Sequence, residues 1–187
     1  FYYEVLRYDD ECFREAIASV DRAISMYQER LDFRFMKSNA YISYERESPD
    51  MAMANLLSLV NDFYAGKEKW TYGGEVADPA FFADAMQDYC YSFYTLGTPA
   101  SYEAFRKLSE TMLGHNPDNT GFMNNIGSYH MLVRKDFKTA VKWYGKVLKK
   151  QPGDYTAIKN SALAARRMGN VKMEKKYLQM LAEHGTD

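Results

Sequence analysis

The residue types that most often carry catalysis or bind metals are thinly spread along this chain. Its three histidines are His115, His130 and His184, and none has the spacing of an HExxH motif or of a cysteine-pair zinc site. Metal ligands must converge on one helical face or one turn, so this spread predicts no metal site. We expect His130 to pack against neighbouring side chains rather than to bind an ion.

Other candidate groups have simpler explanations than catalysis. Two cysteines, Cys12 and Cys90, do not make a disulfide framework, and we interpret Cys90 as a buried structural thiol. Asp9, Asp10 and Glu11 could coordinate a cation, but capping of a helix explains them more simply. Gly73-Gly74 lacks the strand and lysine of a phosphate loop, and no nucleophile elbow is present. The sequence therefore predicts a protein that is not an enzyme and binds no cofactor.

Charge is distributed unevenly along the chain. Residues 1–133 carry 11 Lys and Arg against 20 Asp and Glu, a net charge of −9, whereas residues 134–187 carry 13 against 5, a net charge of +8. Such asymmetry bears on partners more than on fold. One helical stretch is especially rich in lysine: Lys138, Lys142, Lys146, Lys149 and Lys150. We interpret this run as a solvated face. The alternative is docking onto an acidic surface, including the acidic front of a second copy in a salt-sensitive self-association.

Composition allows a sizeable core and favours helices packed through aromatic side chains. The chain has 187 residues, of which 47% are hydrophobic, with 16 Tyr and 11 Phe that we expect to fill the boundaries between neighbouring helix pairs. No stretch approaches the roughly 18 apolar residues of a membrane span. The chain opens at Phe1 without a methionine, so we interpret it as trimmed or mature. A cytoplasmic location is favoured, and export to the periplasm stays open.

The first 64 residues show helical periodicity. From Asp9 to Tyr27, apolar residues recur at steps of three and four, which predicts an amphipathic helix with Asp9 and Asp10 as caps. Residues 31–44 and 51–64 read as a helical pair, and Ser48-Pro49 between them is typical of a helix start. In that pair Ser38 and Ala54 can serve as the small residues at the helix crossing. An alignment shifted by one or two residues would fit the sequence as well.

Residues 65–79 interrupt this periodicity and predict a loop or insertion. Trp70 within it either packs the loop onto the helices, which we favour, or is an exposed recognition residue. Asp78-Pro79 then begins a new helix.

From Phe81 onward three helix pairs follow at a regular period. The step from Cys90 to Gly127 is 37 residues and that from Gly127 to Ala162 is 35, as is the step from Pro117 to Pro152. Cys90, Gly127 and Ala162 are small residues. Small residues such as Gly127 and Ala140 let the two helices of a pair cross closely. Gly97 and Gly169 fall in the turns between paired helices, where a positive φ closes a short hairpin.

The clearest unit runs from Thr120 to Pro152, with Met123, Ile126, Gly127 and His130 followed by Ala140, Tyr144 and Pro152. This pattern resembles the tetratricopeptide repeat, and the chain is similar to bacterial tetratricopeptide scaffold and adaptor proteins. The resemblance implies an all-α fold, a right-handed α-solenoid of helix-turn-helix repeats with about nine helices. It also implies one superhelical domain made of degenerate repeats in 1–64 with the first truncated, an insertion at 65–79 and three regular repeats in 80–187.

The resemblance further implies a binding groove lined by the first helix of each repeat, which would hold a peptide or a partner protein. The family's groove positions correspond here to Gln87, Tyr91, Tyr94, Asn124, Asn125, Ser128, Met131, Lys159, Leu163 and Arg166. Lys159 and Arg166 could meet a carboxylate, so the expected partner is a protein or peptide of acidic character. These residues could equally be ordinary exposed helix positions.

Two other functions stay open at this point. Pentatricopeptide repeats have nearly the same period and bind RNA, but the acidic front and the lack of paired code residues argue against nucleic acid. The same architecture also occurs as an accessory or regulatory domain of larger or exported proteins.

Overall fold

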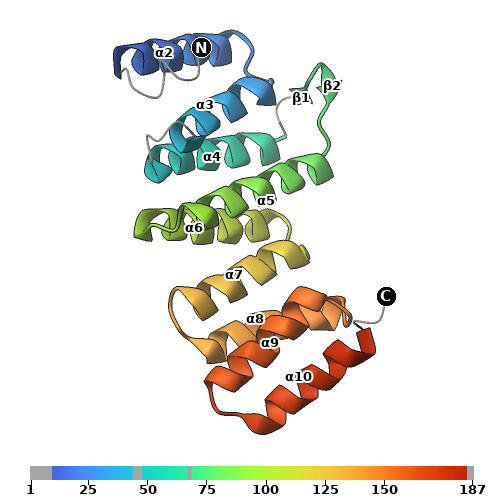
Figure 1. Cartoon of the computed structure of the whole chain (residues 1–187). Coiled ribbons are helices and arrows are strands. Elements are labelled where there is room, and N and C mark those ends of the chain that lie inside the picture. The colour runs from blue at the N-terminus through green and yellow to red at the C-terminus, as the bar shows by residue number, and fades with distance from the viewer. Residues whose placement is uncertain (1–9, 44–47, 67–68, 185–187) are drawn as a thin grey trace. The chain divides into compact units, whose positions relative to one another are not determined.

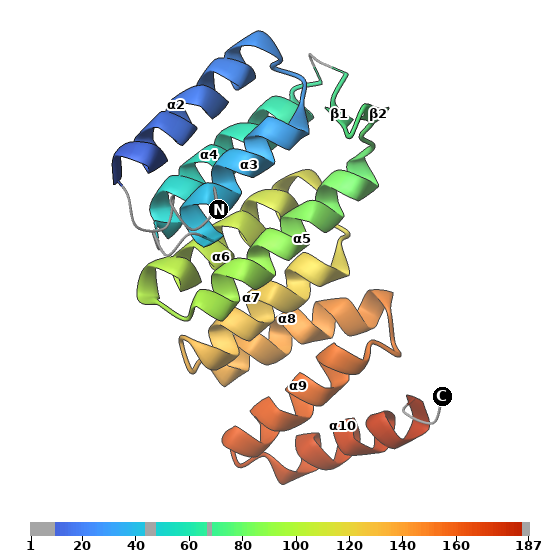
Figure 2. The same cartoon turned by 45° about the horizontal axis from the view of Figure 1, so that its top comes forward.

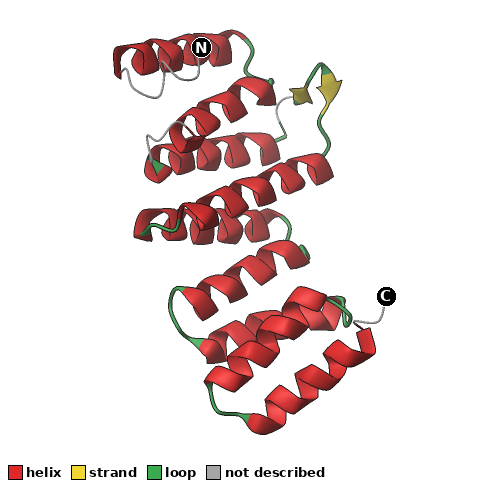
Figure 3. Cartoon of the chain, in the orientation of Figure 1, coloured by secondary structure: helices red, strands yellow, loops and turns green. Residues whose placement is uncertain are grey.

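The computed structural model describes residues 10–43, 48–66 and 69–184 (Figure 1). In these ranges nine α-helices, α2 to α10, account for nearly all regular structure, and one two-stranded hairpin accounts for the rest (Figure 3). The chain therefore has the all-α, helical-repeat solenoid fold that the sequence predicts.

Two compact units make up the chain, Phe1–Ala104 and Phe105–Asp187. The first contains α2 (Asp10–Met26), α3 (Leu31–Ser43), α4 (Pro49–Tyr64), β1 (Thr71–Tyr72), β2 (Glu75–Val76), α5 (Pro79–Leu96) and the beginning of α6 (Pro99–His115). The second contains the rest of α6, α7 (Thr120–Leu132), α8 (Phe137–Lys150), α9 (Tyr155–Arg167) and α10 (Val171–His184). The predicted division into 1–64, 65–79 and 80–187 stays a prediction.

Helix α2 has the predicted amphipathic character. Most of its apolar side chains are half-buried, and one of them, Phe13, meets Tyr41 of α3 edge-on at a centroid distance of 5.7 Å. An ion pair of 2.6 Å between Lys37 and Asp21 joins the polar borders of the same two helices. The predicted cap at Asp9 and the truncated start of the first predicted repeat lie outside the described residues.

Helices α3 and α4 pair as predicted, with a correction of register. Ser38 is fully buried and its hydroxyl lies 2.6 Å from the side-chain nitrogen of Asn55. Ala54 is exposed, however, and Ala52 is the small buried residue of α4. With Ala52 buried in place of Ala54, the bulkier Met53 and Leu56 also lie in the core of the first unit. Pro49 begins α4, as expected from its fixed φ.

Residues 69–79 of the predicted insertion contain more regular structure than the lack of periodicity indicates. They form the hairpin β1–β2, which has antiparallel pairing of Thr71 with Val76 and which Figure 2 shows beside the ends of α3 and α5. Trp70 is only 5% exposed, with its ring centroid 5.9 Å from that of Phe63. Phe63 of α4 in turn stacks on Phe82 of α5 at 3.8 Å. This aromatic cluster confirms that Trp70 packs the segment onto the helices.

In the second unit the closest helix approach lies between α7 and α8. A Cβ atom added to Gly127 would come within 2.6 Å of Cε1 of Tyr144, a distance that real side chains do not tolerate. Tyr144 and Ala140 are fully buried at the same crossing. The predicted role of Gly127 and Ala140 as small residues at a tight crossing is confirmed.

Helix boundaries are set by repeated local chemistry. In the described ranges five carboxylate or amide side chains that directly precede a helix accept a hydrogen bond from the backbone N–H three residues on: Asp78, Asn119, Asp136, Asp154 and Asn170. Gly97 and Gly169 adopt the predicted left-handed conformation in two of the turns, with φ of 69° and 68°. Cys90 is buried, as expected.

Replacing Gly127 by Ala tests the α7–α8 crossing. The added methyl group must displace the Tyr144 ring, so we expect the free energy of unfolding to fall by about 1–3 kcal/mol. Gly145→Ala is the matched control, since a Cβ at Gly145 meets nothing within 4 Å. It should leave stability unchanged or raise it by up to about 1 kcal/mol through helix propensity. Chemical denaturation measures both, and equal stability of the two variants would contradict the crossing.

Candidate functional site

The predicted groove residues on α7 turn out to be partly structural. Asn124 donates its side-chain N–H to both carboxylate oxygens of Asp154, each at 3.3 Å, and so links α7 to the first turn of α9. Ser128 shares a hydrogen bond of 3.3 Å with the Tyr144 hydroxyl. Met131 is buried in the core against Tyr144, so it offers almost no surface to a ligand. Asn125 is half-buried.

The predicted residues on α9 lie together on its exposed face. Lys159 and Leu163 are one turn apart, and Leu163 is 37% exposed. Tyr155, a turn earlier, is 56% exposed, and the Lys159 ammonium lies 5.6 Å from the centre of its ring. Arg166 closes the row and pairs through Nε with Glu174 of α10 at 2.7 Å. This face therefore combines apolar surface with positive charge.

The predicted residues on α5 belong to the first unit. Tyr91 is 69% exposed, Gln87 is half-buried, and Tyr94 packs against Tyr102 with ring centroids 6.0 Å apart. The ten predicted residues thus fall into two groups, three on the first unit and seven on the second.

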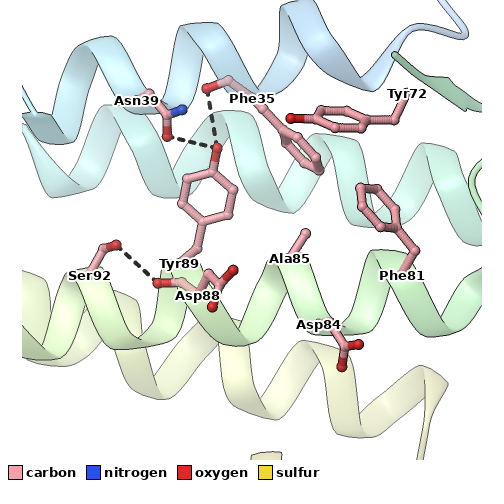
Figure 4. Close-up of a pocket in the computed structure, with 9 residues that line it drawn as sticks. All are labelled: Phe35, Asn39, Tyr72, Phe81, Asp84, Ala85, Asp88, Tyr89 and Ser92. Atoms are coloured by element: carbon pink, nitrogen blue, oxygen red, sulfur yellow. Dashed lines mark hydrogen bonds between the residues drawn. The ribbon is translucent and has the colours of Figure 1, made fainter. Parts of the chain in front are cut away.

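The first unit contains a pocket of about 330 Å³ that the sequence did not predict (Figure 4). We call it the Tyr72 pocket. It is lined by residues of α3, the hairpin and α5: Phe35, Asn39, Tyr72, Phe81, Asp84, Ala85, Asp88, Tyr89 and Ser92. Because it needs a ring from the 65–79 insertion, helical periodicity could not reveal it. The only sequence signal was a pair of acids, Asp84 and Asp88, one turn apart on a helix otherwise rich in aromatic residues.

Four aromatic rings line the Tyr72 pocket. Phe35 is buried and lies 5.8 Å from Tyr72 and 5.7 Å from Tyr89, measured between ring centroids. Tyr72 and Phe81 are 5.1 Å apart and are 44% and 37% exposed. Figure 4 shows Tyr89 reaching from α5 to α3, where its hydroxyl lies 2.9 Å from Oδ1 of Asn39. Burial raises the pKa of the Tyr89 hydroxyl far above its ordinary value, so it stays neutral.

The position of Tyr72 depends on bonds between the hairpin and the beginning of α3. The backbone N–H of Thr71 donates to the carbonyl of Glu29 at 2.9 Å, and that of Gly73 donates to the Asp32 carboxylate at 3.0 Å. Burial alone would raise the pKa of Asp32. The hydrogen bond from Gly73 and the ion pair with Arg30 outweigh burial and hold this pKa below its ordinary value. The contribution of the Asp32 carboxylate to this anchoring is therefore fully present at neutral pH and is lost as the pH falls through the lowered pKa.

No metal centre emerges from the described ranges. No group of three or more His, Cys, Asp or Glu side chains in them lies close enough to share an ion. The histidines sit on α6, α7 and α10, and the ring of His130 packs edge-on against Tyr129 at 5.7 Å. This is the packed role expected for His130. None of the described helices has the length and apolarity to cross a membrane.

Removing the Asp32 carboxylate tests how the hairpin is anchored. In Asp32→Ala the Gly73 amide loses its acceptor, a bond worth about 1 kcal/mol, so its hydrogen exchange at neutral pH should accelerate about fivefold. NMR-detected exchange of the Gly73 amide measures this directly. Asp21→Ala is the control because it removes a carboxylate of α2 that pairs with Lys37 of α3 instead of with a backbone N–H of the hairpin. Unchanged exchange at Gly73 in Asp32→Ala would show that other contacts hold the hairpin.

Comparison with known proteins identifies the fold and nothing narrower. No family model matches the sequence, and no curated protein matches it. Among solved structures, the crystal structure of MamA superposes with a TM-score of 0.59 at 14% identity, covering 94% of this chain and 90% of that one. A second crystal structure of MamA gives 0.57, also at 14% identity, over 92% and 82%. The chain thus shares along most of its length the helical-repeat fold of MamA, a protein of tetratricopeptide type.

Proposed function

We propose that this chain is a non-enzymatic scaffold or adaptor that binds a peptide or partner protein through the first helix of each helix pair. The observation that carries the proposal is the exposed face of α9. There Tyr155 and Leu163 present apolar surface beside the ammonium of Lys159. Protein-binding surfaces combine aromatic or aliphatic anchors with a charged border in this way.

Helix α7 supports the proposal because it lies beside α9. The bond from Asn124 to Asp154 joins the two helices, and Asn125 and Ser128 are half-buried residues of α7. Amide and hydroxyl groups there could hydrogen-bond a peptide backbone. In the first unit, Tyr91 with Gln87 and Tyr94 would form a further contact surface.

Charge favours an acidic partner for the α9 face. Residues 105–187 carry 15 Lys and Arg against 7 Asp and Glu, a net charge of +8. Positive potential accelerates association with acidic proteins, and salt weakens it. We therefore propose an acidic peptide or protein surface as the ligand, bound less tightly at high ionic strength.

Selection from a displayed peptide library tests this function. The intact chain should enrich peptides that carry acidic residues around an apolar anchor. Their affinity should fall at least about tenfold in a Lys159→Glu/Leu163→Ser variant, which removes both the charge and the apolar anchor.

Helix α10 offers a matched control, Lys175→Glu/Leu178→Ser, because both side chains are exposed there. This variant makes the same chemical change off the α9 face and should bind the selected peptides like the parent. Peptides that lose affinity equally in both variants would contradict the proposed surface, as would a library that yields no binder.

A further inference from the structure

The Tyr72 pocket presents aromatic surface to solvent that its own unit leaves uncovered. Tyr72 and Phe81 contact each other at 5.1 Å, and both keep more than a third of their surface exposed. Phe35 and Tyr89 form a buried floor beneath them, fixed by the bond from the Tyr89 hydroxyl to Asn39. The pocket is therefore a preformed aromatic recess rather than a loose surface cluster.

The lining of the same recess carries two negative charges and includes no Lys or Arg. Asp84 and Asp88 lie one turn apart on α5, a helix whose sequence contains no Lys or Arg. Like charges at this spacing repel each other and weaken a helix. In the described part of the chain neither carboxylate forms an ion pair. Three cations in or just before α3 pair with other carboxylates: Arg34 with Asp62, Lys37 with Asp21 and Arg30 with Asp32.

The ligand that best complements exposed aromatic rings beside carboxylates is a cation with a flat apolar face. A guanidinium stacks on aromatic rings and donates in-plane hydrogen bonds to carboxylates, whereas an ammonium is a compact, strongly hydrated charge. We propose that the Tyr72 pocket binds the guanidinium of an arginine side chain presented by a partner protein. The arginine would stack on Tyr72 or Phe81 and direct its N–H groups to Asp84 and Asp88.

The charge of the first unit supports a protein as the source of this arginine. Residues 1–104 carry 9 Lys and Arg against 18 Asp and Glu, a net charge of −9, which would attract a basic segment. This site differs from the α9 face in residues, in unit and in the sign of its charge. Failure of one proposal would therefore leave the other standing.

An NMR titration of the intact chain tests the proposal with three blocked tripeptides, acetyl-Gly-Arg-Gly-amide and its citrulline and lysine counterparts. Citrulline keeps the shape of arginine without its charge. We expect saturable shifts of the Tyr72 and Phe81 ring signals with the arginine peptide. Binding of the lysine peptide should be weaker, and that of the citrulline peptide at least about tenfold weaker.

Two double variants distinguish the effect of the pocket carboxylates from the effect of the net charge of the protein. Asp84→Asn/Asp88→Asn keeps the shape of the pocket and should weaken arginine binding at least about tenfold. Asp50→Asn/Glu75→Gln makes the same change in net charge at exposed positions outside the pocket lining and should bind like the parent. Thermal unfolding of each variant confirms that it is folded.

Three results would overturn the proposal. Equal binding of arginine and citrulline, or of arginine and lysine, would refute recognition of the guanidinium. Undiminished binding in the Asp84→Asn/Asp88→Asn variant would place the peptide elsewhere. Shifts of the Tyr72 and Phe81 signals that follow protein concentration without peptide would assign the pocket to a second copy of the chain.

Discussion

The helix pairs depend on one constraint, the close approach of two helices where a large aromatic ring packs against a small residue. At the α7–α8 crossing the Tyr144 ring occupies the space that a side chain on Gly127 would need. Because interiors are packed to near-crystalline density, such a crossing fixes the distance and the register of the two helices together. The register in turn decides which face of each helix remains exposed. Packing at the helix crossings therefore also determines which side chains of α9 are exposed.

Packing also explains why the aromatic residues divide into two populations. Phe63, Phe82 and Trp70 fill the boundary between α4 and α5 and leave little surface. Tyr72, Tyr91 and Tyr155 belong to the same compositional excess but remain exposed. The first population stabilises the repeats through buried apolar area, and the second would supply the anchors that the proposed binding needs. A rigid helical framework with exposed anchors at its surface suits recognition.

Helical periodicity predicted most of the fold because its cause is local. Apolar steps of three and four residues, aspartate caps and turn glycines act within a few residues, so the helices from α2 to α10 could be read from the sequence. The register of Ala52 could not, because small residues at positions 52 and 54 satisfy the same pattern. The hairpin at Trp70 and the Tyr72 pocket depend on contacts between distant residues, such as Asp32 with Gly73, which no local pattern encodes. Of the predicted groove residues, Met131 belongs to the core because its turn of α7 faces Tyr144.

Site-specific photo-crosslinking in the native host would test the central claim most directly, that this protein acts through partner binding on the α9 face. A benzophenone amino acid would replace Leu163 on α9 and, separately, Leu178 on α10, which are 37% and 43% exposed. Our account predicts a defined protein adduct at position 163 that weakens at high salt, and none at position 178. Equal adducts at both positions, or none at position 163, would contradict it.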